Sequence, residues 1–226
     1  MVVRQTSSEF FNQQELSQIN DAVESAEKVT SGEIVPVLAT QSDAYDRGLF
    51  LSALMMAALG SGIVFVVFCI PALWAKHYLP GFEAPLYALL PAQILTLLGG
   101  YHLAARIPGL HRTFLSRAQM QKSVDSAAKR AFRQFHLSAT KDATGIMIYV
   151  SIFERMVVVL ADHAISKQHE QATWDKVRNH ITSGLADGDG AKGFSNAVEE
   201  CGTILAQHFP IQPDDTNELP NHVRLM

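Results

Sequence analysis

The chain has 226 residues, with 18 Lys or Arg against 22 Asp or Glu and a formal net charge of −4. This balance leaves no basic face, so the composition predicts that nucleic acid is not a partner. The two cysteines, Cys69 and Cys201, are far apart and match no metal-ligand spacing. They are therefore expected to be buried free thiols in a reducing compartment.

The first predicted elements are a helix and a strand. Asn12 should begin the helix, because Glu15 follows three residues later in capping-box spacing. Gly32 is expected to close the helix as its left-handed cap. Residues 33–40 then predict a strand, in which Pro36 favours an edge position or a bulge because it has no N–H to donate.

Two long uncharged stretches follow, residues 49–74 and 84–105, joined by the short segment 75–83. Each has the ~20 mostly apolar residues that a helix needs to cross the hydrocarbon core of a bilayer. Together they predict a transmembrane helical hairpin in a lipid bilayer. The alternative is a pair of buried core helices, but such helices usually run nearer to ~11–12 residues.

The distribution of Lys and Arg predicts the orientation of this hairpin. Such residues accumulate on the cytoplasmic side of a membrane. The connecting segment offers only Lys76, whereas the other ends of the two stretches are flanked by Arg47, Arg106, Arg112, Arg117 and Lys122. The start of the chain also lacks the apolar core and cleavage site of a signal peptide. We therefore expect a multi-pass protein of the cell (inner) membrane, with both termini and the soluble domain in the cytoplasm.

Beyond the hairpin the sequence returns to the pattern of a soluble domain. Apolar residues at helical spacing predict a second helix over 120–135. Two β-rich runs, 145–152 and 156–162, are separated by only three residues, which predicts an antiparallel hairpin. Both runs are apolar almost throughout, as expected for a sheet that is covered on both faces.

Two further helices complete the predicted order. They are expected over 169–185 and 191–208, with Gly188 and Gly190 between them, and a polar, turn-rich tail follows. The order is helix, strand, membrane hairpin, helix, two strands and two helices. It predicts an α/β fold in the form of a small α/β/α sandwich with a mixed sheet, in which the first two strands are parallel.

The predicted domain boundaries follow from the insertion of the hairpin within this sandwich. Residues 1–48 form the first part of the α/β domain, 49–105 the transmembrane hairpin, 106–209 the second part and 210–226 the polar tail. The two ends of the hairpin must lie close together, because one domain is built from the segments on both sides of it.

The connection between the last two helices holds the most motif-like sequence. Residues 188–193 match G-x-G-x-x-G, but a dinucleotide site needs a strand before this motif, so a helix–helix connection is favoured. Asp187 and Asp189 resemble the start of a calcium loop, although the fifth and twelfth positions lack the ligands of an EF-hand. The two aspartates are therefore the candidate metal ligands of a weaker calcium or magnesium site.

The remaining polar residues form no constellation of catalytic type. Glu154 and Arg155 are expected at a solvated hairpin tip. Asp162 and His163 close a strand, at an edge where open α/β sheets often bind ligands, although a simple turn is the commoner explanation. The tail carries an acidic group that offers cation ligands or is a flexible solvated segment: Asp214, Asp215 and Glu218.

Four segments of the chain resemble the conserved blocks of TPM domains. The first is Thr30-Ser-Gly-Glu-Ile-Val-Pro-Val-Leu-Ala39, which follows the leading helix. The second is the hairpin 144–162, in which an Arg follows the turn, and the others are the helix segment 193–202 and the tail segment 214–221. The likeness covers nearly all of the soluble part and implies an α/β/α sandwich.

The resemblance also implies candidate activities. The TPM family is often labelled a phosphatase after plant thylakoid relatives, some members bind calcium, and others act as accessory proteins of membrane complexes. Bacterial members are often associated with LemA-type membrane proteins. Many relatives carry a signal peptide and hold the domain outside the cytoplasm, whereas this chain is expected to keep it inside.

The residues and the resemblance together predict a membrane-anchored protein of unassigned biochemical activity, acting as an interaction or accessory module for a membrane complex. The alternative is a metal-assisted phosphatase at the membrane surface, which would need clustered carboxylates to hold a hard cation. A small channel or carrier is a third interpretation, but neither uncharged stretch has a polar stripe, and Gln93 is their only amide.

Overall fold

The computed structural model describes residues 6–70, 74, 89–107, 112–137, 144–167, 169–212 and 217–226. The chain divides into two compact units. A helical unit lies within residues 44–117, and a larger α/β unit is formed by the described residues of 6–43 and 118–226. The helical unit is therefore inserted in the sequence of the α/β unit.

The α/β unit contains a four-stranded mixed sheet with the strand order β3-β2-β1-β4. β1 (Glu33–Ala39) and β2 (Gly145–Ser151) are parallel, and β2 and β3 (Met156–Ala161) form the antiparallel hairpin. Both pairings confirm the predictions. β4 (Arg224–Leu225) pairs parallel with β1 and was not predicted, because two residues carry no periodic pattern.

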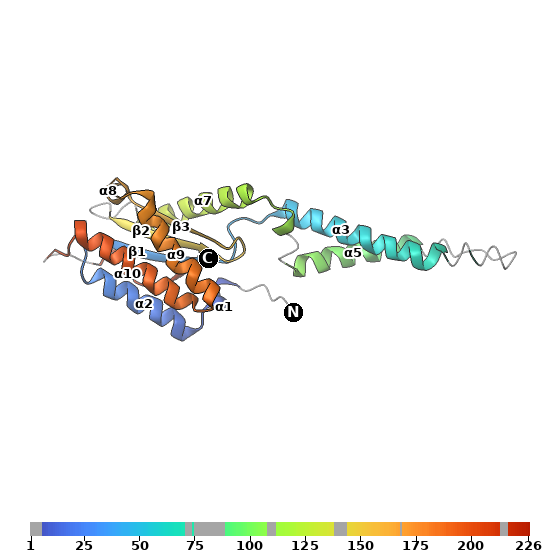
Figure 1. Ribbon diagram of the computed structural model, residues 1–226. Helices are drawn as coiled ribbons and strands as arrows, with labels where there is room; N and C mark the ends of the chain where they lie inside the picture. The colour runs from blue at the N-terminus through green and yellow to red at the C-terminus, as the bar shows by residue number, and fades with distance from the viewer. Residues whose placement is uncertain are drawn as a thin grey trace. The chain divides into compact units, whose positions relative to one another are not determined.

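Helices cover both faces of this sheet (Figure 1). One layer holds α2 (Gln13–Glu27), α9 (Gln171–Asp187) and α10 (Gly190–His208), whose apolar residues form one core cluster with one face of the strands. The other layer is α7 (Arg117–Gln134), which forms a second cluster with the opposite face. All residues of β1 and β2 are buried, which confirms the prediction of a sheet covered on both faces.

The first long helix begins as predicted but ends differently. The Asn12 side chain accepts a hydrogen bond from the Glu15 N–H at 2.9 Å, and the Glu15 carboxylate accepts one from the Asn12 N–H at 2.7 Å. The helix ends at Lys28, which has right-handed helical geometry, so the prediction of a left-handed cap at Gly32 was wrong. Gly32 is needed for another reason, since a Cβ there would lie 2.7 Å from Leu205 Cδ2.

Several segments meet at the carboxyl end of β1. The Met226 carbonyl accepts hydrogen bonds from the Thr40 N–H at 2.8 Å and from the Ser7 hydroxyl at 2.9 Å. Ser7 begins the short helix α1 (Ser7–Phe10), and the Met226 N–H donates to the Leu38 carbonyl at 3.0 Å. The last residues are thus part of the sheet edge. Glu218, which the sequence assigned to a cation site or a flexible solvated tail, donates its N–H to the Glu33 carboxylate at 2.9 Å. Asp214 and Asp215 lie outside the described residues.

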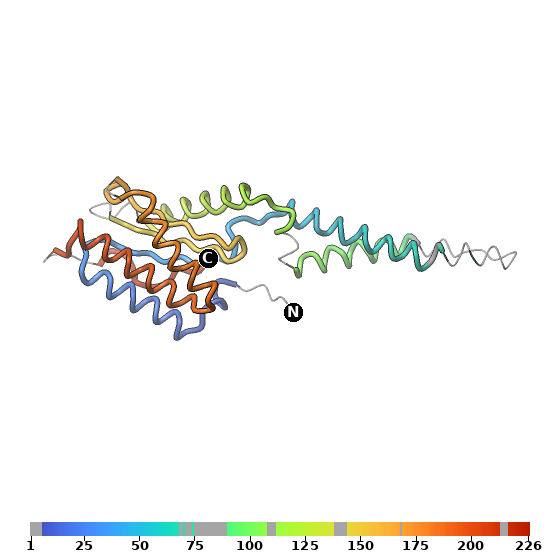
Figure 2. The backbone as a smooth tube through the Cα atoms, in the orientation of Figure 1, coloured from blue at the N-terminus to red at the C-terminus, as the bar shows by residue number. Residues whose placement is uncertain are grey.

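The helical unit contains α3 (Asp46–Val64), which continues into the π-helical turn η1 (Phe65–Cys69), and α5 (Leu89–Arg106). α3 and α5 run side by side (Figure 2). By length and composition, the segment Asp46–Val67 qualifies to cross a membrane, and in the described part of the chain no other helix passes that test. The second predicted span, 84–105, begins outside the described residues, so the two-helix hairpin remains a prediction.

Small residues form the contact between α3 and α5. Ala53, Ala57 and Ala104 are buried there, and a Cβ on Gly100 would lie only 2.9 Å from the Ala57 backbone nitrogen. One polar pair joins the two helices, because the Ser61 hydroxyl donates a hydrogen bond to the Gln93 side-chain oxygen. The two backbones therefore approach closely, without large side chains between them.

Candidate functional site

The predicted metal ligands, Asp187 and Asp189, lie at the turn between α9 and α10. Asp187 ends α9, and Gly188 takes the left-handed conformation with φ of 80° that permits the sharp turn. Asp189 is the N-cap of α10, where its carboxylate accepts a hydrogen bond from the Lys192 N–H at 3.2 Å. Asp189 therefore stabilises the start of α10, whether or not it also binds a metal.

Both aspartates line the same surface hollow of about 530 Å³. Lys176 and Lys192 line it too, so cationic side chains share the space with the two carboxylates. Calcium needs about 6–8 oxygen ligands. Across the described ranges, no group of three or more His, Cys, Asp or Glu side chains is placed to hold a metal ion. The calcium or magnesium site remains a prediction.

The glycine pattern 188–193 serves helix packing, as predicted for a helix–helix connection. A Cβ on Gly184 would lie 2.6 Å from the Gly193 Cα, and one on Gly193 would lie 2.7 Å from the His180 carbonyl oxygen. α9 and α10 therefore touch backbone to backbone next to their turn. The motif follows a helix, which is not the strand that a dinucleotide site requires.

A buried polar cluster, which we call the Glu154 cluster, lies where β1 and β2 end. The Glu154 carboxylate accepts hydrogen bonds from the Ser42 N–H at 2.8 Å and from the Ser151 hydroxyl. The Ser42 hydroxyl donates to Ser151 Oγ at 2.9 Å and shares a hydrogen bond of 3.2 Å with the Tyr149 hydroxyl. Glu154 is fully buried, so the prediction of a solvated hairpin tip was wrong for this residue.

The Glu154 cluster has the properties of a structural hydrogen-bond network that connects segments of the α/β unit. Burial raises the pKa of Tyr149 above its ordinary value; the hydrogen bond with Ser42 opposes this shift and the nearby Glu154 charge adds to it. Ser42, Ser151 and Glu154 are all buried, so the cluster does not offer a carboxylate or hydroxyl to a substrate in solvent. The one signal in the sequence was its place at the carboxyl ends of two parallel strands.

The second strand-end motif is a helix cap. Asp162 precedes the short helix α8 (His163–Ser166), and its Oδ1 accepts a hydrogen bond from the His163 N–H at 2.6 Å. Its other carboxylate oxygen, Oδ2, is buried and has no hydrogen-bond partner among the residues that the structure places. The backbone therefore makes the simple turn that the sequence predicts. One carboxylate oxygen of Asp162 has no hydrogen-bond donor among the described residues.

Cys201 is a buried free cysteine, as predicted. Burial, together with the nearby Glu200 charge, raises the pKa of its thiol far above the ordinary range. A thiol that stays protonated is a poor nucleophile and a poor metal ligand. Cys201 therefore belongs to the apolar core between α10 and the sheet.

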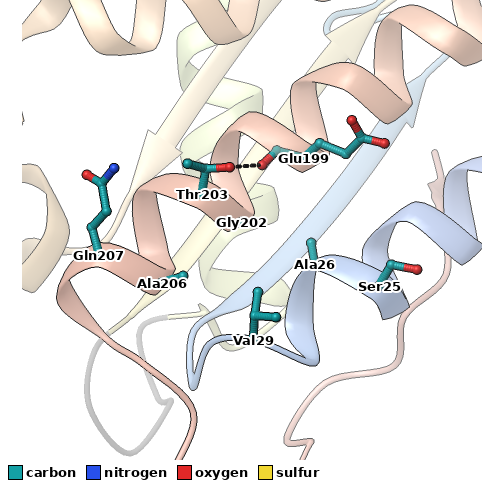
Figure 3. A pocket seen from close by; sticks show the side chains of 8 residues that line it. All are labelled: Ser25, Ala26, Val29, Glu199, Gly202, Thr203, Ala206 and Gln207. Atoms are coloured by element: carbon teal, nitrogen blue, oxygen red, sulfur yellow. Dashed lines mark hydrogen bonds between the residues drawn. The ribbon is translucent and has the colours of Figure 1, made fainter.

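A second hollow of about 480 Å³ lies between α2 and α10 (Figure 3). The two helices approach closely at the bottom of this hollow, since a Cβ on Gly202 would lie 2.8 Å from the Ala26 Cβ. The only drawn hydrogen bond runs from the Thr203 hydroxyl to the Glu199 carbonyl, within the helix. The lining is small and largely apolar: Ser25, Ala26, Val29, Glu199, Gly202, Thr203, Ala206 and Gln207.

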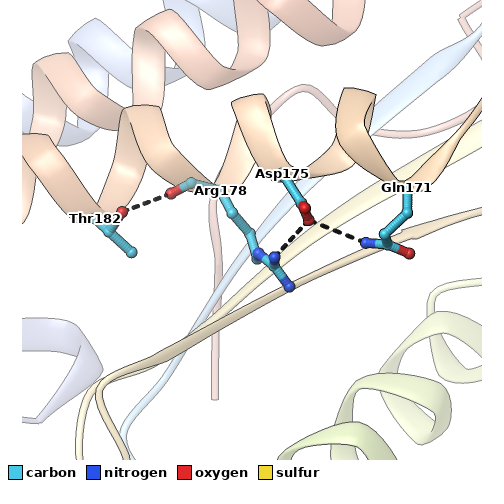
Figure 4. A network of polar contacts seen from close by, with 4 residues as sticks. All are labelled: Gln171, Asp175, Arg178 and Thr182. Carbon is cyan, nitrogen blue, oxygen red and sulfur yellow. Dashed lines mark hydrogen bonds and ion pairs between the residues drawn. The ribbon is translucent and has the colours of Figure 1, made fainter.

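A polar chain runs along the surface of α9 (Figure 4). Asp175 accepts hydrogen bonds from Gln171 at 3.1 Å and from Arg178 at 2.5 Å, and the Thr182 hydroxyl donates to the Arg178 carbonyl at 3.1 Å. The Asp175 and Arg178 side chains are each 43% exposed, so their ion pair adds little to stability. These contacts stay within one helix and do not converge on a ligand.

Comparisons with known proteins agree with this fold. The NMR structure of the BA42 protein from the psychrophilic bacterium Bizionia argentinensis is similar, with a TM-score of 0.56 and 21% sequence identity over 96% of this chain and 95% of that chain. At that identity the likeness concerns the fold alone. None of the curated proteins matches this chain. The family model described as the TPM domain matches residues 113–204, which run from just before α7 into α10. This chain therefore carries a TPM domain.

Proposed function

We propose that this protein is an integral membrane protein in which the helical unit anchors the TPM domain, and that the TPM domain is an interaction or accessory module for a membrane complex. The observation that carries the proposal is the exposed apolar surface of α3 and α5. Among the side chains that are more than half exposed are Phe50, Leu59, Ile63, Leu90, Ile94 and Leu95.

This surface differs from that of a soluble helix pair. A soluble protein rarely exposes a large continuous apolar patch, because water makes such a patch costly. Only 11% of the apolar window within Asp46–Val67 is buried, whereas a core helix would be mostly buried. A lipid environment covers these side chains without any further protein contact.

The inside of the helix pair also supports a membrane setting. Lipid gives no hydrophobic drive for two helices to associate, so membrane helices pack through small residues and interhelical hydrogen bonds. Ala53, Ala57 and Gly100 provide the first kind of contact, and Ser61 with Gln93 the second. Large side chains outside and small ones inside are the arrangement that suits a bilayer.

We further propose the orientation with cytoplasmic termini and a cytoplasmic TPM domain in the cell (inner) membrane. Arg47 precedes the main part of α3, Arg106 ends α5, and Arg112 follows it, whereas the connecting segment carries only Lys76. The excess of basic residues on one side favours the cytoplasm for that side.

The proposed role as an interaction module is supported by how the polar residues are used. The Ser42, Ser151 and Glu154 side chains of the Glu154 cluster are buried, and Asp189 caps a helix. A membrane protein partner is proposed, with LemA-type proteins as the candidate that the family resemblance supplies. The alternative, a metal-assisted phosphatase, draws on one observation, namely that Asp187 and Asp189 line the same hollow.

The anchor is tested by washing membranes that contain the full chain with alkaline carbonate. The protein should stay in the pellet, and the double variant Leu59→Arg, Ile63→Arg should not, because two charges in the hydrocarbon core oppose insertion. Recovery of the parent protein in the wash would overturn the membrane proposal.

The module role is tested by affinity purification of the carbonate-resistant protein from mild detergent. A membrane protein in near-stoichiometric yield, which is absent when an unrelated two-helix membrane protein carries the same tag, is the expected result. Turnover of a phosphate ester by the purified chain, lost in the double variant Asp187→Asn, Asp189→Asn, would instead establish the phosphatase.

A further inference from the structure

One edge of the sheet is open in the described structure. β3 is the last strand in the order β3-β2-β1-β4. The Asp162 N–H donates to the Gly145 carbonyl at 2.9 Å, so the backbone N–H of Asp162 faces β2. Because alternate residues of an antiparallel strand bond to the same neighbour, the N–H and C=O groups of Val157, Val159 and Ala161 point away from β2.

Most of these outward groups have no hydrogen-bond partner in the part of the chain that the structure describes. The Ala161 carbonyl accepts a hydrogen bond from the Ser166 hydroxyl at 3.1 Å. The outward backbone groups of Val157 and Val159 make no hydrogen bond within the described ranges of the chain. Five of the six β3 residues are partly exposed, whereas every β2 residue is buried.

β3 also lacks the features that protect a sheet edge. Natural edge strands carry a Lys, a Pro or a bulge, or are covered, because an open edge pairs with other chains. β3 reads Met-Val-Val-Val-Leu-Ala, without charge or proline. The opposite edge is protected, since β4 has only two residues and the Glu218 N–H donates to the Glu33 carboxylate at 2.9 Å beside β1.

Opposite charges stand at the two ends of β3. Arg155 precedes the strand, is exposed and makes no ion pair with any residue that the structure describes. Asp162 follows the strand and is partly exposed. A segment lying along β3 would therefore meet a basic side chain at one end and an acidic side chain at the other.

We propose that the outer edge of β3 is the docking site for an extended segment of a partner protein, which adds to the sheet as an antiparallel strand. The segment alternates apolar and polar residues, has an acidic residue opposite Arg155 and has a basic residue opposite Asp162. Main-chain hydrogen bonds provide affinity in such strand addition, and side chains provide specificity. The inference deepens the proposed function, since it names the surface that the interaction module uses.

A partner segment fits this edge better than a second copy of the chain. The α/β unit continues into residues 44–117 through Asp43 and Ala118. The hydroxyl of Ser123, in the first half of α7, donates a hydrogen bond to Asp43 at 2.9 Å, so both exits lie near the start of α7. Antiparallel pairing of two β3 strands would place the exits of the two copies at opposite ends of the joint sheet. Two anchors in one bilayer do not suit that arrangement, whereas a partner segment has no such constraint.

The test uses the full chain in detergent and a fluorescent eight-residue probe, Lys-Thr-Val-Thr-Val-Thr-Val-Glu, read by fluorescence anisotropy. In antiparallel pairing its Lys meets Asp162 and its Glu meets Arg155. Binding should be at least about tenfold weaker for the probe with the two end residues exchanged, because like charges would then face each other at both ends of β3.

A matched pair of variants shows whether the probe uses the edge. Val159→Pro removes an outward N–H without removing a hydrogen bond to β2, so it should abolish binding, and Val159→Thr keeps the N–H and should bind like the parent. Amide hydrogen exchange gives a second readout in the parent protein. The Val157 and Val159 amides should exchange quickly alone and slowly with the probe, while Val158 and Leu160 stay slow in both.

Three results would overturn the inference: no binding at millimolar probe, equal binding of both probes, or slow exchange at Val157 and Val159 that appears at high protein concentration without probe. The last result would assign the edge to a second copy. These failures leave the proposed function untouched if the protein still resists carbonate and still copurifies with a stoichiometric membrane partner.

Discussion

Glu154 connects two segments that are far apart in the sequence. Its carboxylate is buried and ties the β2–β3 turn to the backbone at Ser42, the segment through which the chain leaves the α/β unit. A buried carboxylate is tolerated only when its hydrogen bonds are made. The Glu154 cluster therefore holds the exit toward the helical unit in one place.

Glu154→Ala should destabilise the α/β unit by about 3 kcal/mol, because the Ser42 N–H and the Ser151 hydroxyl lose their acceptor in a buried site. Urea unfolding of the full chain in detergent measures the loss. Gln212→Ala, at an exposed position, is the control and should change stability by less than about 0.5 kcal/mol. Equal stability of the two variants would contradict the role of the cluster.

Cys201 should make the stability of the α/β unit fall at alkaline pH. Burial raises the pKa of the folded thiol above its ordinary value of 9.0, so the native state keeps a proton that the unfolded chain releases. Stability is complete below that ordinary value and is lost as pH rises beyond it. Urea unfolding between about pH 8 and about pH 10 should show a decline that is smaller in Cys201→Ala. The same slope in both proteins would rule out this source.

Calcium binding by Asp187 and Asp189 can be tested at these two residues directly. If Asp187 and Asp189 bind calcium, calorimetric titration of the solubilised chain should give heat that disappears in the double variant Asp187→Asn, Asp189→Asn. The variant retains side-chain oxygens, and Asn is also a good N-cap, so α10 should stay intact. Absence of heat in the parent at millimolar calcium would end the metal-assisted alternative.

At the scale of elements, glycine decides how closely helices pack. The pair α9 and α10 meets at Gly184 and Gly193, and the pair α3 and α5 meets at Gly100. Neighbouring glycines differ, since a Cβ on Gly99 meets nothing within 4 Å. The two adjacent positions therefore provide an internal control for the contact between α3 and α5.

Gly100→Ala should separate α3 from α5 and lower the thermal stability of the helical unit by about 1–3 kcal/mol, because the new methyl group overlaps the backbone at Ala57. Gly99→Ala should be neutral or slightly stabilising, since alanine favours a helix more than glycine does. Thermal unfolding followed by circular dichroism in detergent compares the two. An equal effect of both substitutions would show that the helices do not pack through Gly100.

The whole molecule joins an α/β unit, of which residues 113–204 match the TPM domain, to an inserted helical unit, and its orientation is open to direct measurement. In a background of Cys69→Ala and Cys201→Ala, a single cysteine at His77→Cys should react with an impermeant maleimide on intact cells. A single cysteine at Asn221→Cys should react only after lysis, because the basic residues flanking α3 and α5 favour a cytoplasmic domain. The reverse pattern would place the TPM domain outside.

Features that depend on local pattern could be predicted from the amino-acid sequence. The capping box at Asn12 marked the start of α2, and the apolar runs before and after Glu154 predicted the antiparallel pair β2 and β3. The uncharged stretches identified the helical unit, since length and hydropathy need no knowledge of neighbours. The pair Asp187 and Asp189 was placed correctly at a helix–helix turn, but whether it binds a metal is a question of ligand number that the sequence does not answer.

The burial of polar residues and the open edge of the sheet depend on tertiary contacts and could not be predicted from local pattern. Glu154 has the local sequence of a solvated turn, and its burial depends on Ser42, which is more than a hundred residues away in sequence. β4 exists because residues 224–225 reach β1 across the whole chain, and the open edge at β3 follows from the strand order. These properties arise from contacts between segments that are distant in sequence. The hydrophobic periodicity of one element predicts only which of its own faces is buried, so it cannot predict such contacts.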